Sequence, residues 1–240
     1  MHGLGSSTTF YETALSLSKL SSQYCLVRYD FDGHGLSPLS SKTEGAISID
    51  SLAEDLKEVM DVVGVKKAKG VVGHSMSGLV ALTFAAKYPD RTEKLFLIGP
   101  MKAMAPAGQE VMLKRASTVL SSGLSSIVSA VASSATSAHT KTHSPLSLAL
   151  IRALVLGTSI EGYAAACKAL AGASNPDFKA IEAEVLVVGG AEDYLSSPEL
   201  IGGLVGELRK ARKVQLEGVG HWHAVERPAE VAAELDGFFL

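Results

Sequence analysis

Three side chains that together could activate a nucleophile follow three separate apolar runs of the sequence. Ser75 lies in GHSMSG, Asp193 in GGAEDYLSSPE and His221 in GVGHWHAVERP. A serine hydroxyl becomes a strong nucleophile when a histidine takes its proton, and a carboxylate can hold that histidine in the required tautomer. The residue types therefore predict acyl transfer, with Ser75 as nucleophile, His221 as base and Asp193 as the orienting acid.

Each of these residues also has a simpler interpretation, and two neighbours could replace members of the group. A serine after a strand is often a helix N-cap, and an aspartate in such a loop often forms a turn. Glu192 and His223 lie beside Asp193 and His221, so they stay open as substitutes. We favour Ser75, Asp193 and His221 because all three directly follow predicted strands.

An acyl-transfer site also needs two backbone N–H donors for the negative oxygen of its intermediate. In a strand-to-helix turn of the G-x-S-x-G kind, the residue after the serine supplies one, which is Met76 here. We expect the other from Leu4, in the HGLG stretch at 2–5; the alternative is a plain glycine turn before the first helix. His74 and Trp222, which flank the candidate nucleophile and base, are candidate substrate contacts.

The elements that must position these residues alternate along the chain. Runs rich in Val, Ile and Leu predict buried strands at 24–30, 68–73, 94–99, 184–190 and 213–219. Helical patterns lie at 8–23, 48–64, 78–90 and 226–240. This alternation predicts an α/β fold, a mainly parallel sheet with helices on both faces. Ligands of such a sheet bind at the carboxyl ends of its strands, which is where the three candidate residues lie.

The alternation stops between residues 101 and 174, where no strand pattern occurs. This Ser- and Ala-rich segment has apolar residues spaced three and four apart, which predicts an inserted helical cap, or lid, with a loop at 135–145. The α/β core would then consist of a first part at 1–100 and a second part at 175–240. The alternative is a poorly ordered spacer.

Composition excludes several other functions. The chain has 240 residues, 47% of them hydrophobic and 20% charged, and a net charge of -3. Without a basic patch we expect neither nucleic acid nor membrane as a partner. Cys25 and Cys167 form no metal-binding spacing and are expected to be free thiols. With no signal-peptide pattern, a cytoplasmic location is expected, and we expect no cofactor and no metal.

The motifs together resemble the α/β-hydrolase superfamily over nearly the whole chain. HGLGSS, RYDFDGHGLS, GHSMSG, GGAEDYLSSPE and GHWHAVERPAEV occur in the superfamily's order. Within it, GYAAACKAL at 162–170 and HAVERP are similar to 3-oxoadipate enol-lactonases, which open an enol-lactone ring with water. The resemblance implies a serine hydrolase of a small carboxylic ester or lactone. His34 and Ser37, in the GHGLS turn, are expected to be structural.

Several positions depart from the superfamily pattern. Position 77 is serine where the strict elbow has glycine, and Asp32 stands where arginine is common. An enol-lactonase pocket must also hold a substrate carboxylate. Three cations of the expected cap could do so: Arg115, Arg152 and Lys168. Each of them could instead be a solvated helix residue.

The resemblance also implies further strands before the HG motif, so N-terminal strands of the fold are expected to be missing from this chain. Without the strand that enters the HG turn, the runs at 24–30 and 68–73 would face each other across a gap of about 10 Å, one strand width. Two other function classes stay open: a small-ligand binding protein on the same fold, and a hydrolase of C–C bonds or thioesters. The oligomeric state is not predicted.

Overall fold

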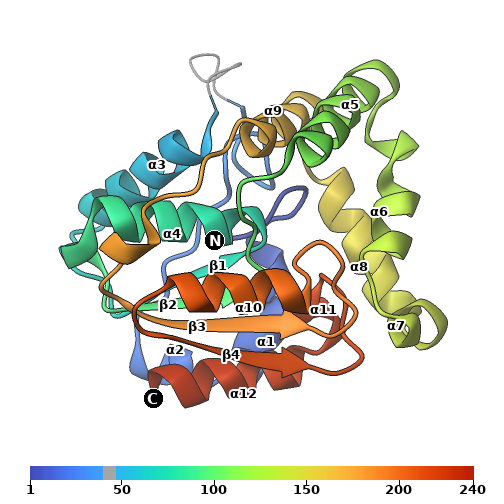
Figure 1. The fold of residues 1–240 in the computed structure, drawn as a ribbon. Helices are drawn as coiled ribbons and strands as arrows, with labels where there is room; N and C mark the ends of the chain where they lie inside the picture. Colours follow the sequence, from blue (N-terminus) through green and yellow to red (C-terminus); the bar gives the residue numbers. More distant parts are fainter. Residues whose placement is uncertain (40–46) are drawn as a thin grey trace.

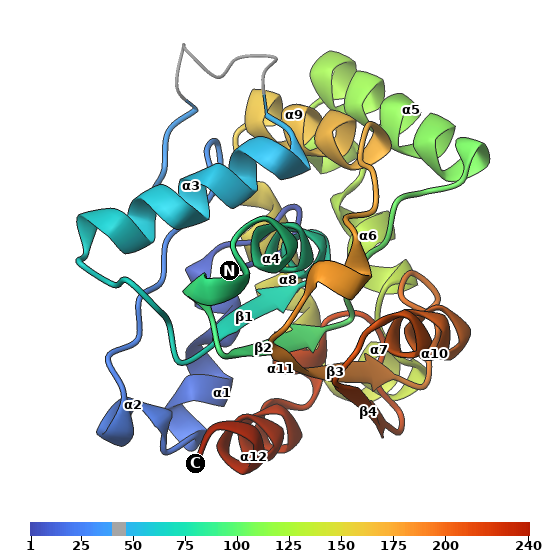
Figure 2. The same cartoon turned by 60° about the vertical axis from the view of Figure 1, so that its left-hand side comes forward.

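The computed structural model describes residues 1–39 and 47–240, and a four-stranded parallel sheet lies at its centre (Figures 1 and 2). The strands lie side by side in chain order: β1 (Val71–His74), β2 (Lys94–Ile98), β3 (Glu184–Gly190) and β4 (Ala211–Leu216). In the two inner strands nearly every side chain is buried, which accounts for their unbroken apolar runs. The predicted α/β class with a parallel sheet is confirmed.

Helices cover both faces of the sheet, as the alternation predicts. One face carries α3 (Ile49–Val62), α4 (Met76–Lys87) and α10 (Pro198–Glu207), and the other carries α1 (Glu12–Leu17) and α12 (Pro228–Phe239) (Figures 1 and 2). Helix α4 runs through the hydrophobic core, where ten consecutive residues from Met76 to Ala85 are buried. This burial fixes the first turn of α4, and with it the serine that precedes it.

Residues 106–171, between β2 and β3, are largely helical, and the helices at 128–156 lie beyond the carboxyl ends of the strands (Figure 1). The helices of this segment are α5 (Pro106–Ser122), α6 (Val128–Ser134), α7 (Ala138–His143), α8 (Pro145–Leu156) and α9 (Ile160–Ala171), with a short 3-10 turn, η3 (Leu124–Ser126). The predicted loop at 135–145 is wrong, because α7 lies within it. Ser137 caps that helix by accepting the Thr140 N–H through its side chain, and such a short capped helix leaves no periodic signal.

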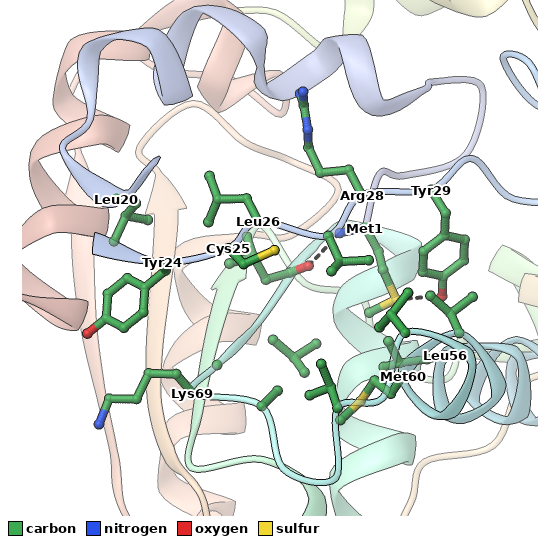
Figure 3. Close-up of a pocket in the computed structure, with 18 of the residues that line it drawn as sticks. Met1, Leu20, Tyr24, Cys25, Leu26, Arg28, Tyr29, Leu56, Met60 and Lys69 are labelled. Carbon is green, nitrogen blue, oxygen red and sulfur yellow. Dashed lines mark hydrogen bonds between the residues drawn. The ribbon is translucent and has the colours of Figure 1, made fainter. Parts of the chain in front are cut away.

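The N-terminal region differs most from the sequence prediction. The helix expected at 8–23 is divided into the 3-10 turn η1 (Thr8–Tyr11), α1 and α2 (Leu20–Gln23). The strand expected at 24–30 is wrong: these residues form no strand. A cavity of about 340 Å³ separates them from β1, and apolar side chains such as Leu26, Met60 and Val72 line it (Figure 3). The two runs are therefore too far apart to pair.

Short elements complete the chain: η2 (Pro89–Arg91), η4 (Phe178–Ala180) and α11 (His223–Glu226). Among the described residues, no single helix is both long enough and apolar enough to cross a membrane. The pair α8 and α9 reaches that length and composition together, but it is bent by 93° at its break.

Candidate active site

The tight turn between β1 and α4 places Ser75 in an unusual backbone conformation. Ser75 has φ 54° and ψ -118°, and within residues 1–39 and 47–240 it is the one residue other than glycine with a positive φ. Such a conformation costs about 1–3 kcal/mol and persists only where the surroundings enforce it. The Ser75 N–H donates to Ile98 O, and its carbonyl accepts from the N–H groups of Gly78 and Met101.

The turn is possible because strand and helix backbones nearly touch. A Cβ on Gly73 would lie 2.4 Å from Ser77 O, so no side chain fits there. Ser77, the departure from the strict elbow pattern, is fully buried and satisfied. Its Oγ accepts the His74 N–H at 2.8 Å and lies 2.8 Å from Met1 O. A serine at position 77 therefore replaces glycine without leaving a buried polar group unpaired.

Gly73→Ala is expected to lower the free energy of unfolding by about 3 kcal/mol, because the added methyl group meets backbone atoms that cannot move independently. Urea unfolding of the purified protein measures this change. Gly203→Ala in α10 is the matched control: nothing lies within 4 Å of its Cβ position, so it is expected to stabilise by about 0.5–1 kcal/mol. Equal effects of the two substitutions would contradict the close approach.

The structure brings the predicted serine, histidine and aspartate into one hydrogen-bonded chain. His221 Nε2 lies 2.8 Å from Ser75 Oγ, and His221 Nδ1 lies 2.8 Å from Asp193 Oδ2. A carboxylate only accepts hydrogen bonds, so Nδ1 carries the proton and Nε2 presents its lone pair to the serine. This is the arrangement in which an imidazole can take a proton from a hydroxyl.

Asp193 is fixed by its own turn. Its Oδ1 accepts the N–H groups of Leu195 and Ser196, each at 2.9 Å, and the residue is buried. Burial alone raises the pKa of Asp193, but the charge and hydrogen bond of His221, with further donors, outweigh it and hold that pKa well below its usual range. The acid is therefore ionised at neutral pH.

Glu192 and His223, the two substitutes considered from the sequence, take no part in the Ser75–His221–Asp193 hydrogen bonds. Glu192 is exposed and its Oε2 accepts the Ala138 N–H at 2.7 Å. His223 is buried, its Nδ1 lies 2.9 Å from His221 O, and its Nε2 is 4.0 Å from Asp193 Oδ2. Burial lowers the pKa of His223, which makes it a neutral neighbour of the acid.

The main chain of His221 is held on both sides. Its N–H donates to Ala135 O at 2.8 Å. Its carbonyl accepts from two imidazoles, His74 Nε2 at 2.8 Å and His223 Nδ1 at 2.9 Å. His74 is buried and stacked on Phe10 with ring centroids 4.2 Å apart, and burial lowers its pKa well below the usual value. The structure thus places His74 where it supports the loop that carries His221.

The HGLG stretch passes directly beside the serine. A Cβ on Gly3 would lie 3.0 Å from Ser75 Cβ, and Met1 O accepts the His74 N–H at 3.3 Å. In the part of the chain that the structure describes, the N–H groups of Leu4 and Met76 donate to no protein acceptor. Two unpaired donors on segments that meet at Ser75 are what an anionic oxygen at this position requires.

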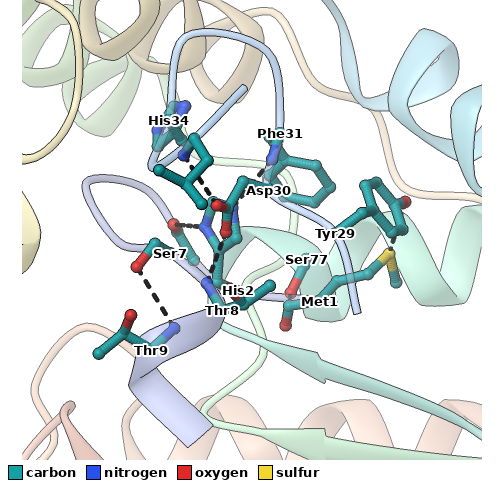
Figure 4. A network of polar contacts seen from close by, with 12 residues as sticks. Met1, His2, Ser7, Thr8, Thr9, Tyr29, Asp30, Phe31, His34 and Ser77 are labelled. Carbon is teal, nitrogen blue, oxygen red and sulfur yellow. Dashed lines mark hydrogen bonds and ion pairs between the residues drawn. The ribbon is translucent and has the colours of Figure 1, made fainter. Parts of the chain in front are cut away.

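Three hydrogen bonds fasten residues 2–8 to residues 30–36, and Figure 4 shows those made by His2 and Thr8. Phe31 N–H donates to His2 Nε2 at 3.0 Å, and Thr8 N–H donates to Asp30 Oδ1 at 2.6 Å. Gly5 N–H donates to His34 Nε2 at 3.3 Å. Burial lowers the pKa of His2 to about 3, so its ring stays a neutral acceptor. His34 was expected from the sequence to be structural. The roles of His2 and Asp30 were not identified, although the HG and DFDGHG motifs that contain them were.

The helical segment contributes a tyrosine and an arginine next to this loop. A Cβ on Gly5 would lie 2.6 Å from the ring of Tyr163. Burial raises the pKa of Tyr163 to about 12, and Arg115 acts against that rise through its charge and a hydrogen bond. Arg115 is half-buried, whereas the other two cations considered from the sequence, Arg152 and Lys168, are exposed.

Trp222, the second predicted substrate contact, is buried directly after the histidine. Its backbone N–H donates to Glu226 Oε1 at 3.1 Å, and its ring Nε1 has no hydrogen-bond partner among the described residues. Over the same residues, no group of three or more His, Cys, Asp or Glu side chains is placed to hold a metal ion.

Comparisons with known proteins support the family and the fold. A model of the Alpha/beta hydrolase family matches residues 1–234. A protein of Caulobacter segnis named for carbamate hydrolysis is 33% identical over 51% of this chain. 3-Oxoadipate enol-lactonase 2 of Acinetobacter baylyi is 28% identical over 73% of it. The crystal structure of the enol-lactonase from Burkholderia xenovorans LB400 superimposes with a TM-score of 0.90 at 28% identity, covering 99% of this chain and 88% of that one.

The two sequence relatives are matched over only part of their own length. The alignments span 44% of the Caulobacter protein and 64% of the Acinetobacter lactonase.

Proposed function

The chain belongs to the alpha/beta hydrolase family, and from that premise we propose that it hydrolyses a small carboxylic ester or lactone through an acyl-enzyme on Ser75. One observation carries the proposal: a serine in a strained turn has its Oγ 2.8 Å from an imidazole nitrogen whose ring is fixed by a buried carboxylate. A serine that only capped a helix would need neither the strain nor the imidazole.

Acylation uses the groups around Ser75 in sequence. Ser75 Oγ attacks the carbonyl carbon while His221 Nε2 takes its proton, and Asp193 stabilises the imidazolium that forms. The N–H groups of Leu4 and Met76 hold the negative oxygen of the tetrahedral intermediate. When that intermediate collapses, His221 gives its proton to the leaving oxygen.

Deacylation repeats these steps with water as the nucleophile. His221 takes a proton from the water, the acyl bond to Ser75 breaks, and the serine recovers its proton. In a lactone the leaving oxygen stays attached to the acyl group, so the product is a single hydroxy acid, or its keto form when an enol is released. The buried site, with Ser75 at 8% and His221 at 5% exposure, suits a small substrate that helices α5–α9 enclose as a lid.

Arg115 supports a substrate that carries a carboxylate, as an enol-lactone of the 3-oxoadipate kind does. The arginines that pair with carboxylates among the described residues are Arg28, Arg91 and Arg227. Arg115 is not one of them, and it lies beside Tyr163, whose ring touches the HGLG loop. A half-buried guanidinium without an anionic partner is suited to bind an anionic substrate group.

Arg115→Gln is expected to lower kcat/KM for an anionic ester about 10- to 100-fold, since a charged hydrogen bond contributes about 1.5–3 kcal/mol. A neutral ester should change by less than about twofold. The measurement compares 4-nitrophenyl hydrogen glutarate with 4-nitrophenyl pentanoate, which have acyl chains of equal length. Arg152→Gln is the control on an exposed cation of the same segment. An equal loss for both esters would contradict carboxylate recognition by Arg115.

The first test of the proposal itself is labelling of the wild type by a fluorophosphonate, together with hydrolysis of p-nitrophenyl acetate. Stoichiometric labelling on Ser75, identified by peptide mass, is the expected result. A panel of 3-oxoadipate enol-lactone, simple esters, a thioester and a C–C substrate then ranks the leaving groups. A folded protein that shows no labelling would favour the ligand-binding alternative.

A further inference from the structure

Backbone contacts join the inserted helical segment to the loop that carries His221. Ala135 O accepts the His221 N–H at 2.8 Å. A Cβ on Gly220 would lie 2.8 Å from both Ala135 O and Ser137 N, so glycine is the residue that allows this approach. Residues 135–137 are therefore packed directly on residues 220–221. A shift of either segment is transmitted to the other.

One buried carboxylate binds both sides of this contact. Glu226, in α11, is 6% exposed. Its Oε2 accepts the Ser137 N–H at 2.8 Å and the Thr140 hydroxyl at 2.9 Å, and its Oε1 accepts the Trp222 N–H at 3.1 Å. The two oxygens thus divide between the inserted segment and the residue that follows His221.

The side chain has no ion-pair partner among the described residues. Its three donors are neutral, and they also depend on it, because the Ser137 and Trp222 N–H groups are buried beside it. A carboxylate is rarely buried unless its contacts require it. Three donors from two segments converge on this one side chain. They require an acceptor with two oxygens.

A weaker contact joins the same segment to the loop of Asp193. Glu192 Oε2 accepts the Ala138 N–H at 2.7 Å, and Tyr194 OH donates to Ser134 Oγ at 3.1 Å. Both pairs are exposed, so water competes with them. The segment 134–140 thus contacts both loops that hold the candidate acid and base. Among the described residues, Glu226 is the buried side chain that hydrogen-bonds it to them, beside the backbone bond from Ala135 to His221.

We propose that Glu226 is a positioning residue for the reaction proposed above, on which this inference rests. It touches neither substrate nor the reacting atoms. Its carboxylate locks residues 135–140 onto residues 220–222 and so fixes the backbone from which the His221 ring extends toward Ser75. Displacement of a catalytic group by about 1 Å can cost about 100-fold in rate.

The test is Glu226→Gln, which presents an amide N–H₂ to donors that need an acceptor. We expect kcat and the rate of fluorophosphonate labelling of Ser75 to fall about tenfold or more, with KM within about threefold. Both are measured well below the melting temperature, where circular dichroism shows the variant folded. Trp222 is the single tryptophan of the chain, so a change in its fluorescence reports movement of this loop directly.

Two further variants complete the test: one that weakens the same contact and one that serves as a control. Thr140→Val removes one donor and is expected to shift kcat and fluorescence in the same direction by less; it also serves if Glu226→Gln does not fold. Glu230→Gln, on an exposed carboxylate of α12, should change neither. Wild-type kcat and labelling in folded Glu226→Gln, or in Thr140→Val where that variant replaces it, would overturn the positioning role alone, while a wild type without labelling would overturn the proposed function and this role together.

Discussion

Ser75→Ala is expected to lower kcat for any ester or lactone substrate about 10⁴- to 10⁶-fold, since the serine and its base act as one unit. Fluorophosphonate labelling should disappear with it. The free energy of unfolding should change by only about 1 kcal/mol, the contribution of one hydrogen bond to His221. Steady-state kinetics, labelling and urea unfolding on the same preparation separate the loss of chemistry from a loss of fold.

The neighbouring serine supplies the control for that experiment. Ser77 lies two residues away, is fully buried, and bonds to His74 and Met1. Ser77→Ala should lower stability by about 1 kcal/mol through these lost bonds while labelling of Ser75 persists. Turnover retained in Ser75→Ala, or labelling lost only in Ser77→Ala, would show that the nucleophile has been assigned to the wrong residue.

The residues of the hydrogen-bonded chain could be read from the sequence because each follows a strand that forms as predicted. Parallel strands bring their carboxyl ends to one edge of the sheet, so Ser75, Asp193 and His221 meet although up to 146 positions separate them. Neither the 2.8 Å distances nor the positive φ of Ser75 could be predicted in this way. The strained turn at Ser75 depends on the close approach at Gly73, which a local pattern does not reveal.

The parts that sequence patterns missed depend on tertiary neighbours. Residues 24–30 have the composition of a strand, but a strand needs a partner within hydrogen-bonding distance, and a cavity lies between them and β1. Helix α7 is six residues long and rich in Thr and His, so its helicity comes from capping and packing and not from periodicity. In both places context decides against local propensity.

The roles of the buried histidines around the site were the hardest to predict from the sequence. His2, His34, His74 and His223 all lie buried around the HGLG loop or the His221 loop, and burial lowers the pKa of each. Neutral imidazole offers one donor and one acceptor, so it can satisfy main-chain groups in places where water does not reach. From their sequence positions these histidines are expected close to the reacting groups. Their hydrogen bonds indicate that they support the HGLG loop and the His221 loop.

The second large effect is expected for Asp193→Asn. The neighbouring His221 holds the pKa of Asp193 well below its usual range, so the wild-type carboxylate accepts the Nδ1 proton throughout the neutral range. An asparagine amide can instead donate to Nδ1, which moves the imidazole proton to Nε2 and leaves no lone pair facing Ser75. We expect kcat to fall about 10⁴-fold, as in other sites where the orienting acid is replaced by its amide.

The control for this variant is its acidic neighbour. Glu192→Gln removes the same charge one residue away, from a side chain that bonds to Ala138 and not to the histidine, so kcat/KM should change by less than about threefold. Because the Asp193→Asn effect acts through the tautomer, it should persist at every pH where the fold survives, which a kcat profile across pH 6–9 measures. A Glu192→Gln variant as slow as Asp193→Asn would leave open which of the two carboxylates orients the histidine.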